Sequence, residues 1–281
     1  MTAPPDPARL TVRFWGVRGS TPTPQAGWLG VGGNTACVEV QAADGSRVVL
    51  DMGTGARALG YALAAEAAGG PGETDVLLSH FHWDHLQGLP FFAPLYIPGQ
   101  TVRFHAATGA DRLRGFLRGQ MAFPYFPVPF PDLAAATEAV EVEDGVPFAV
   151  GSLMVRSFPV HHPQGAHGYR IEAGGAVVVY ATDYEHGSPS HDAGLREVAR
   201  GADVLVSDAQ YTPDEYALRA GWGHTTWEHA AALAAEAGVG RLLLFHHDPS
   251  HDDAALARVL DRARARFPAT DLAVEGLEIE L

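Results

Sequence analysis

The chain of 281 residues contains no lysine and a single cysteine. All 19 basic residues are arginines and are outnumbered by 33 acidic residues, so the formal net charge is −14. A surface this acidic argues against a large nucleic acid as the partner, because proteins that bind the phosphate backbone present a basic face. The lone Cys37 excludes an internal disulfide framework and a thiolate-rich metal site, and we interpret it as a buried strand residue.

The sequence also lacks an apolar run of membrane-spanning length, and the segment MTAPPDPARL contains no apolar signal core. We therefore expect a cytoplasmic protein that makes no membrane contact. Its hydrophobic content of 47% is that of an ordinary soluble globular protein. We predict a disordered Pro-rich tail at residues 1–9 and one domain at 10–281.

Hydrophobic periodicity predicts strands that alternate with helices. The expected strands are 10–15, 37–41, 47–51, 75–79, 153–159, 169–173, 176–181, 203–207, 241–245 and 272–279. The expected helices are 56–68, 110–119, 192–200, 226–237 and 252–267. This order favours a layered α/β protein with helices outside, and pattern alone does not separate one parallel sheet from two packed mixed sheets.

The segment 90–133 is predicted to contain a lid. Its part 121–130, MAFPYFPVPF, carries prolines that exclude a regular helix or a central strand. Its aromatic side chains must pack against something, which indicates a wall over a pocket, a loop held on the core, or the contact surface of a homodimer.

The run His80–His85, with the sequence HFHWDH, contains four potential metal ligands directly after a predicted strand. Because side chains alternate along a strand, the spacing of His80 and His82 directs both imidazoles to one side of the chain. Asp84 and His85 lie in the following turn. Imidazole and carboxylate ligands suit zinc, and also manganese or iron.

Further histidines and aspartates follow three more predicted strands, at His161, His162, Asp183, His246 and His247. The ends of strands are where open sheets place their ligands. With one ligand from each of these strand ends and four from the first run, the chain supplies about seven ligands, which is enough for two divalent metal ions with open coordination sites. We therefore predict a catalytic dinuclear centre.

These residues carry a resemblance to a known family. The string SHFHWDHLQGL resembles the H-x-H-x-D-H signature of the metallo-β-lactamase superfamily, and the similarity extends from FWGVRGSTPTP and GGNTACVEV to LLLFHHDP. The resemblance implies a four-layer αββα sandwich of two mixed β-sheets with outer helices, and two metals in the cleft at the sheet edges.

The resemblance also implies a ligand set. One metal would be held by His80, His82 and His162, and the other by Asp84, His85 and His246, with Asp183 bridging the two. His162 is preferred to His161 because it lies six residues before Gly168, the spacing of the phosphodiesterase branches, and His246 is preferred to His247 because it directly follows an apolar run. The neighbours His161 and His247 are candidates for hydrogen-bond donors behind the ligands. Asp51 resembles the aspartate that orients the first histidines.

The C-terminal half is similar to one branch of the superfamily, ribonuclease Z and related phosphodiesterases. GWGHTTWEHAA resembles the His-Ser-Thr motif of that branch, with Thr225 in place of serine, and VLVSDAQYT occupies the place of its His-Glu-Ala-Thr motif. The resemblance implies that His224 protonates the leaving oxygen and that Asp208 raises its basicity. The alternative is that His224 is a solvated loop residue.

We therefore predict a phosphodiesterase that cleaves a small cyclic or linear phosphodiester through a metal-activated hydroxide, which Asp84 would orient. Arg18 and Asn34 are candidates for substrate contact. The chain shows no Lys-rich insertion like the arm with which ribonuclease Z grips transfer RNA. Three alternatives remain: a thioester or lactone hydrolase on the same centre, a catalytically silent metal-binding sensor or partner-binding protein, and, less favoured, a redox di-iron protein.

Overall fold

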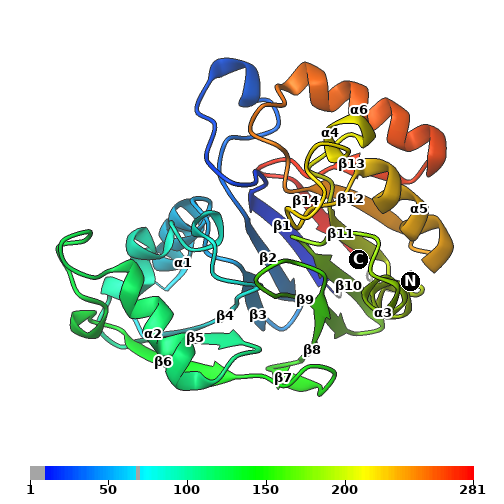
Figure 1. Cartoon of the computed structure of the whole chain (residues 1–281). Helices are drawn as coiled ribbons and strands as arrows, with labels where there is room; N and C mark the ends of the chain where they lie inside the picture. The colour runs from blue at the N-terminus through cyan, green and yellow to red at the C-terminus, as the bar shows by residue number, and fades with distance from the viewer. Residues whose placement is uncertain (1–9, 68–69) are drawn as a thin grey trace, which may run out of the picture.

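Two seven-stranded β-sheets face each other in the computed structural model, which describes residues 10–67 and 70–281 (Figure 1). The tail predicted at 1–9 and residue 68 of the first predicted helix lie outside the described residues. No helix in the described ranges combines the length and the hydropathy that a membrane span requires.

The first sheet has the strand order β14-β1-β2-β3-β4-β5-β6. Its strands are β1 (Leu10–Gly16), β2 (Cys37–Ala42), β3 (Arg47–Leu50), β4 (Gly72–Leu77), β5 (Gln100–Ala106), β6 (Ala136–Glu141) and β14 (Glu278–Glu280). Pairing is antiparallel from β14 to β3 and parallel from β3 to β6, so the sheet is mixed.

The second sheet has the order β13-β12-β11-β10-β9-β8-β7. Its strands are β7 (Phe148–Val150), β8 (Leu153–Val160), β9 (Ala166–Ala173), β10 (Ala176–Ala181), β11 (Val204–Asp208), β12 (Arg241–Phe245) and β13 (Thr270–Leu272). The strands from β10 to β13 are parallel, and those from β7 to β10 are antiparallel. Both sheets are therefore mixed, as predicted.

The inner faces of the two sheets form the central core. In β1 the burial alternates residue by residue, which directs Leu10, Val12 and Phe14 towards the other sheet. There Phe14 meets Phe245 with ring centroids 6.3 Å apart, and Tyr180 packs edge-on against Phe245 at 5.6 Å. Aromatic pairs of this geometry add to the stabilisation that comes from burying apolar area.

Helices cover the two outer faces (Figure 1). Their bounds are α1 (Ala56–Glu66), α2 (Ala110–Gln120), α3 (Pro189–Ala199), α4 (Pro213–Tyr216), α5 (Trp227–Ala237) and α6 (Asp253–Arg266). α1 and α2 share a buried cluster with the first sheet that includes Cys37, and α3, α5 and α6 share another with the second sheet. These four layers confirm the predicted αββα sandwich.

Two parts of the sequence-based strand assignment were wrong. The predicted final strand 272–279 is divided: β13 ends at Leu272 in the second sheet, and β14 begins at Glu278 in the first sheet. Strands β5, β6 and β7 were not predicted. β6 has the burial pattern of a half-exposed edge strand and contains two glutamates, so it lacks the apolar run that marks a strand in sequence.

Candidate metal centre

The polar residues predicted from four strand ends converge in one place. The run His80–His85 follows β4 of the first sheet, whereas His162, Asp183 and His246 follow β8, β10 and β12 of the second sheet. The structure brings seven ligand candidates into interlocking groups, within each of which the donor atoms lie no more than 4.8 Å apart. One group contains His80, His82, His162 and Asp183, and a second contains Asp84, His85 and His246. A third group, which contains Asp183, His224 and His246, links the first two.

Asp183 lies between these groups. Its Oδ1 is 3.6 Å from His80 Nε2, and its Oδ2 is 3.1 Å from His85 Nε2 and 3.3 Å from His246 Nε2. A single carboxylate thus faces histidines of both groups, which is the position a bridging ligand requires.

Three of the aspartates and histidines at the strand ends have a left-handed backbone. The φ angles are 62° for Asp51, 50° for Asp183 and 58° for His246. Residues with a Cβ pay a conformational cost for this region, and such strain gathers at functional sites where the surrounding structure holds it. The turn at each strand end redirects the side chain towards the cluster.

The cluster fits metal ions because several of its buried nitrogens have no protein partner. Among the described residues, His80 Nε2 and both ring nitrogens of His162 are buried without a hydrogen bond. A buried polar atom left in this way costs free energy. Coordination to a divalent cation would satisfy these nitrogens, and the mixed imidazole and carboxylate donor set suits zinc, manganese or iron.

The pKa values of His80 and His162 also fit metal binding. Burial lowers the pKa of His80 well below its usual value and lowers that of His162 to about 4, so both imidazoles keep a free lone pair at neutral pH. Burial acts in the same direction on His85, but the carboxylates of Asp183, Asp84 and Asp51 outweigh it and raise the pKa. Without a metal, the proton on His85 compensates these carboxylates, and a divalent cation held by His85 would replace it.

Asp51 is hydrogen-bonded to His85 of the first run. Its Oδ2 lies 2.8 Å from His85 Nδ1 and accepts hydrogen bonds from the hydroxyls of Ser79 and Tyr180, both at 2.8 Å. Its Oδ1 accepts the Ser79 N–H. The Ser79 hydroxyl is also 3.1 Å from His80 Nδ1. One buried carboxylate therefore fixes which ring nitrogen each histidine turns towards the cluster.

Sequence reasoning missed several residues that position the ligands. Gln210 Oε1 lies 2.8 Å from His246 Nδ1, the Ser20 N–H donates to Asp84 Oδ2 at 2.6 Å, and Gln164 Oε1 lies 2.6 Å from His82 Nε2. They lie in loops with no ligand-like sequence pattern, so their contacts become visible only in the fold.

His224 lies beside the cluster and is paired with Asp208. Their Nδ1 and Oδ2 atoms are 2.8 Å apart, and the His224 ring stacks on His246 with centroids 4.9 Å apart. Burial works to lower the pKa of His224, but the Asp208 carboxylate outweighs burial and raises it to about 9. The structure thus places His224 in a buried position and excludes the solvated loop residue.

Glu185 holds the loop that carries His224. Its carboxylate accepts the Gly221 N–H at 2.5 Å, the Gly223 N–H at 2.8 Å and the Tyr216 hydroxyl at 3.0 Å. Gly223 has a φ of 92°, and a Cβ there would lie 2.3 Å from the His162 ring. Glycine is needed at this position both for its backbone conformation and for the close approach to a ligand.

In each adjacent histidine pair, the residue chosen from the sequence is the one that faces the cluster. His162 and His246 face the cluster, whereas His161 Nδ1 lies 3.1 Å from the Glu185 carbonyl oxygen and His247 Nε2 lies 2.9 Å from that of Ala273. The expectation that His161 and His247 donate hydrogen bonds to the ligands was wrong. Adjacent residues at a strand end point to opposite sides, so each neighbour faces away.

The two predicted substrate contacts were also wrong. The Arg18 side chain is fully buried, and its guanidinium donates to the carbonyl oxygens of Gly32, Trp28 and His251. The Asn34 side-chain amide donates to Glu275 Oε2 at 3.0 Å. Both residues stabilise the loops behind the cluster. Both residues were selected because they lie in loops near the site, but their side chains point away from the cluster.

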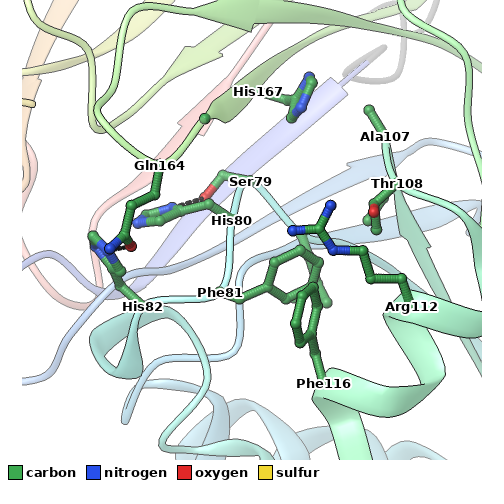
Figure 2. Close-up of a pocket in the computed structure, with 13 residues that line it drawn as sticks. Ser79, His80, Phe81, His82, Ala107, Thr108, Arg112, Phe116, Gln164 and His167 are labelled. Atoms are coloured by element: carbon green, nitrogen blue, oxygen red, sulfur yellow. Dashed lines mark hydrogen bonds between the residues drawn. The ribbon is translucent and has the colours of Figure 1, made fainter.

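Two cavities adjoin the cluster. The front cavity, about 400 Å³, is lined by Ser20, Phe81, His82, Trp83, Asp84, Asp183 and His224. The side cavity, about 430 Å³, begins at Ser79, His80 and His82 and extends to Thr108, Arg112 and Phe116 of the segment around α2 (Figure 2). Both volumes are those of small-molecule sites.

The aromatic stretch 121–130 lines neither of these cavities. Met121 and Phe130 are buried in the core that α2 shares with the first sheet, Phe126 packs against Phe91 at 5.8 Å, and Tyr125 is 84% exposed. The stretch is therefore no wall of the cavities beside the cluster, although Phe126 and Val128 line another cavity of about 530 Å³. Within 90–133, α2 and the turn before it line the side cavity.

Comparisons with known proteins agree with this geometry. The family model described as a β-lactamase superfamily domain matches residues 46–247, well over half of the chain. A curated relative, ribonuclease BN of Escherichia coli O6:K15:H31 (strain 536 / UPEC), is 28% identical over 250 residues, which cover 72% of this chain and 80% of the relative.

Solved structures share the fold over nearly the whole chain. The metallo-β-lactamase fold protein YhfI from Bacillus subtilis superposes with a TM-score of 0.72 at 20% identity, covering 97% of this chain and 99% of YhfI. A diphosphatase of the PhnP family superposes with a TM-score of 0.69 at 21% identity, covering 97% of this chain and 98% of that protein. With its two mixed sheets, its H-x-H-x-D-H run and the family match, the chain belongs to the metallo-β-lactamase superfamily.

Proposed function

We propose that the protein is a dinuclear metal-dependent phosphodiesterase that acts on small phosphodiesters. The observation that carries this proposal is the buried His224–Asp208 pair, whose His224 lines the front cavity beside the ligand candidates. A hydrolase that expels an alkoxide needs a general acid, and a histidine with a raised pKa beside the reaction centre provides one.

In this proposal two metals are bound, zinc first and manganese or iron as alternatives. One metal would be held by His80, His82 and His162, and the other by Asp84, His85 and His246. Asp183 would contact both metals. When bound, the metals supply Lewis acidity, which polarises a phosphoryl oxygen and lowers the pKa of water. The grouping of donor atoms and the unpaired buried nitrogens support this assignment.

The protein residues hold the proton that the leaving group requires. Asp208 Oδ2 accepts the hydrogen bond of His224 Nδ1, which leaves Nε2 as the atom that donates a proton. With a pKa of about 9, His224 is an imidazolium at neutral pH. Asp84, whose Oδ2 accepts the Ser20 N–H, lines the same cavity and would orient the attacking water.

The substrate class follows from charge and cavity size. Two cavities of about 400 and 430 Å³ accept a small cyclic or linear diester. A net charge of −14 without any lysine disfavours a long nucleic acid, whose binding depends on many phosphate contacts.

A second candidate is the cleavage of RNA, and it rests on the similarity to a protein named ribonuclease BN. The absence of lysine weighs against it. A structured RNA with a free 3′ end, assayed beside the small diesters, separates the two candidates. If the protein cleaves the RNA faster than the small diesters, the substrate is RNA. The proposed phosphodiester hydrolysis would then still hold.

The direct test compares ester classes at equal concentration with zinc-loaded protein. We expect bis(p-nitrophenyl) phosphate to be hydrolysed faster than p-nitrophenyl thioesters or lactones. Faster turnover of thioesters or lactones would contradict the proposal and favour the acyl hydrolase. A protein that binds two metals and hydrolyses none of these compounds would be the sensor or partner-binding protein instead.

A further inference from the structure

The side cavity is lined at its far end by an arginine that takes no part in the proposed chemistry. Arg112 extends from α2 over Phe81 and Phe116 into the cavity (Figure 2). Its guanidinium carbon lies 5.2 Å from the centre of the Phe116 ring, and the rings of Phe81 and Phe116 pack with centroids 4.5 Å apart. Stacking on the ring favours one direction for a long cationic side chain.

The positive charge of Arg112 has no acidic partner. Within the described ranges no carboxylate oxygen lies within 4.0 Å of its guanidinium, whereas Arg114 in the same helix pairs with Asp111 at 2.5 Å. Arg112 is also the single arginine among the residues that line the front and side cavities. Arg112 is exposed and lies at the rim of the side cavity, so in a chain with a net charge of −14 it is the group there that attracts an anion.

The cavity connects this cation to the ligand candidates. Its lining includes His80 and His82 at one end and Arg112 at the other, with the Phe81 ring between them. A molecule whose phosphodiester lies at the cluster can therefore extend along an apolar wall towards a guanidinium. The planar guanidinium binds phosphate through two parallel hydrogen bonds.

We propose that Arg112 determines substrate specificity by binding a second phosphate group, one that the substrate carries in addition to the scissile diester. The part of the substrate between the two phosphates packs against Phe81 and Phe116. This inference rests on the proposed phosphodiesterase activity and narrows its substrate to a small diester with a phosphate monoester at the far end. No bond is made or broken at Arg112.

The test uses two synthetic diesters with the same leaving group. One is p-nitrophenyl phenyl phosphate, and the other carries a phosphate at the para position of the phenyl ring. We expect the wild-type protein to show a kcat/KM about 10- to 100-fold higher for the phosphorylated diester. This factor corresponds to the free energy that one charge-assisted, bidentate hydrogen-bonded contact contributes. In Arg112→Gln this ratio falls to about one.

Arg118→Gln is the matched control. Arg118 lies in the same helix and is exposed, it carries the same charge, and it lines neither cavity beside the cluster. We expect this variant to keep the wild-type ratio. A wild-type ratio near one, or a ratio that survives in Arg112→Gln, would overturn the specificity role.

A binding measurement separates this inference from the proposed function. Calorimetry on zinc-loaded protein compares phenyl phosphate with 1,4-phenylene bisphosphate, which need not be turned over. Tighter binding of the bisphosphate by about tenfold or more, lost in Arg112→Gln, supports the Arg112 site even if no diester is hydrolysed. Equal affinity of the two compounds for the wild-type protein contradicts the site even if diesters are hydrolysed.

Discussion

Replacing Asp208 by asparagine tests the general acid most informatively. Asp208 Oδ2 is 2.8 Å from His224 Nδ1, and the carboxylate also accepts the backbone N–H groups of Asp183, Gln210 and Thr225 at 3.0–3.2 Å. Asparagine has nearly the same shape and keeps one oxygen, which can still accept the Gln210 and Thr225 N–H groups, whereas its amide nitrogen replaces the oxygen that faces Asp183 N and His224 Nδ1. The substitution therefore removes the negative charge with little change in volume.

The expected size follows from the pKa of His224. Asp208 is the largest influence that raises this pKa, to about 9 from the ordinary value of 6.5, which corresponds to about 3 kcal/mol of preference for the imidazolium. Without the Asp208 carboxylate, burial is opposed only by the weaker influence of Asp183 and Asp84, so the pKa falls towards its ordinary value of 6.5. At pH 7.5 the protonated fraction then falls from nearly all molecules to roughly one in ten.

The sign of the pH dependence is fixed by this role. The acid must be protonated, so wild-type kcat/KM falls as the pH rises through about 9, whereas in Asp208→Asn the fall moves to a pH more than two units lower. The assay is a pH profile of zinc-loaded protein on a diester with an alkoxide leaving group. If kcat/KM of Asp208→Asn falls at the same alkaline pH as that of the wild type, with metal content unchanged, Asp208 does not set the protonation of a general acid at His224.

Three further predictions concern the ligand cluster. Asp51→Ala removes the buried carboxylate that orients His85, so metal affinity measured by competition with a chelator should fall about 10- to 100-fold, and an unchanged affinity would contradict its orienting role. Gly223→Ala places a Cβ where the His162 ring lies, so zinc analysis should show loss of about one metal per chain, and full occupancy would argue against His162 as a ligand. Removing metal with a chelator should lower the Tm, since ions that bind only the folded state stabilise it, and re-addition should restore it with saturation at two per chain.

The sequence was sufficient for the cluster because its ligands follow apolar strands. The spacing to Gly168 selected His162, and the preceding apolar run selected His246, from adjacent histidine pairs, and the fold places both in the cluster. The strands themselves are apolar enough to be recognised, as in the buried run of β12.

The same reasoning failed where function depends on a side chain's direction. The two residues after Arg18 lie at the cluster, because Gly19 is next to the His246 ring and the Ser20 N–H donates to Asp84. The Arg18 guanidinium instead points away and donates to backbone carbonyl oxygens. Arg112 was not selected because it lies in a helix with ordinary charge spacing. Only the packing of α2 against the first sheet brings it to the side cavity.

The proposed phosphodiesterase depends on His224, which would protonate the leaving group. A comparison of wild type and His224→Ala on two methyl phosphodiesters, one that releases p-nitrophenol and one that releases an aliphatic alcohol, measures this role. His191→Ala, a substitution outside the cluster, serves as the control. p-Nitrophenolate leaves without a proton, whereas an alkoxide needs one. We predict that His224→Ala slows release of the alcohol at least about 100-fold more than release of p-nitrophenol, with metal content unchanged. Equal losses on both substrates would contradict the account.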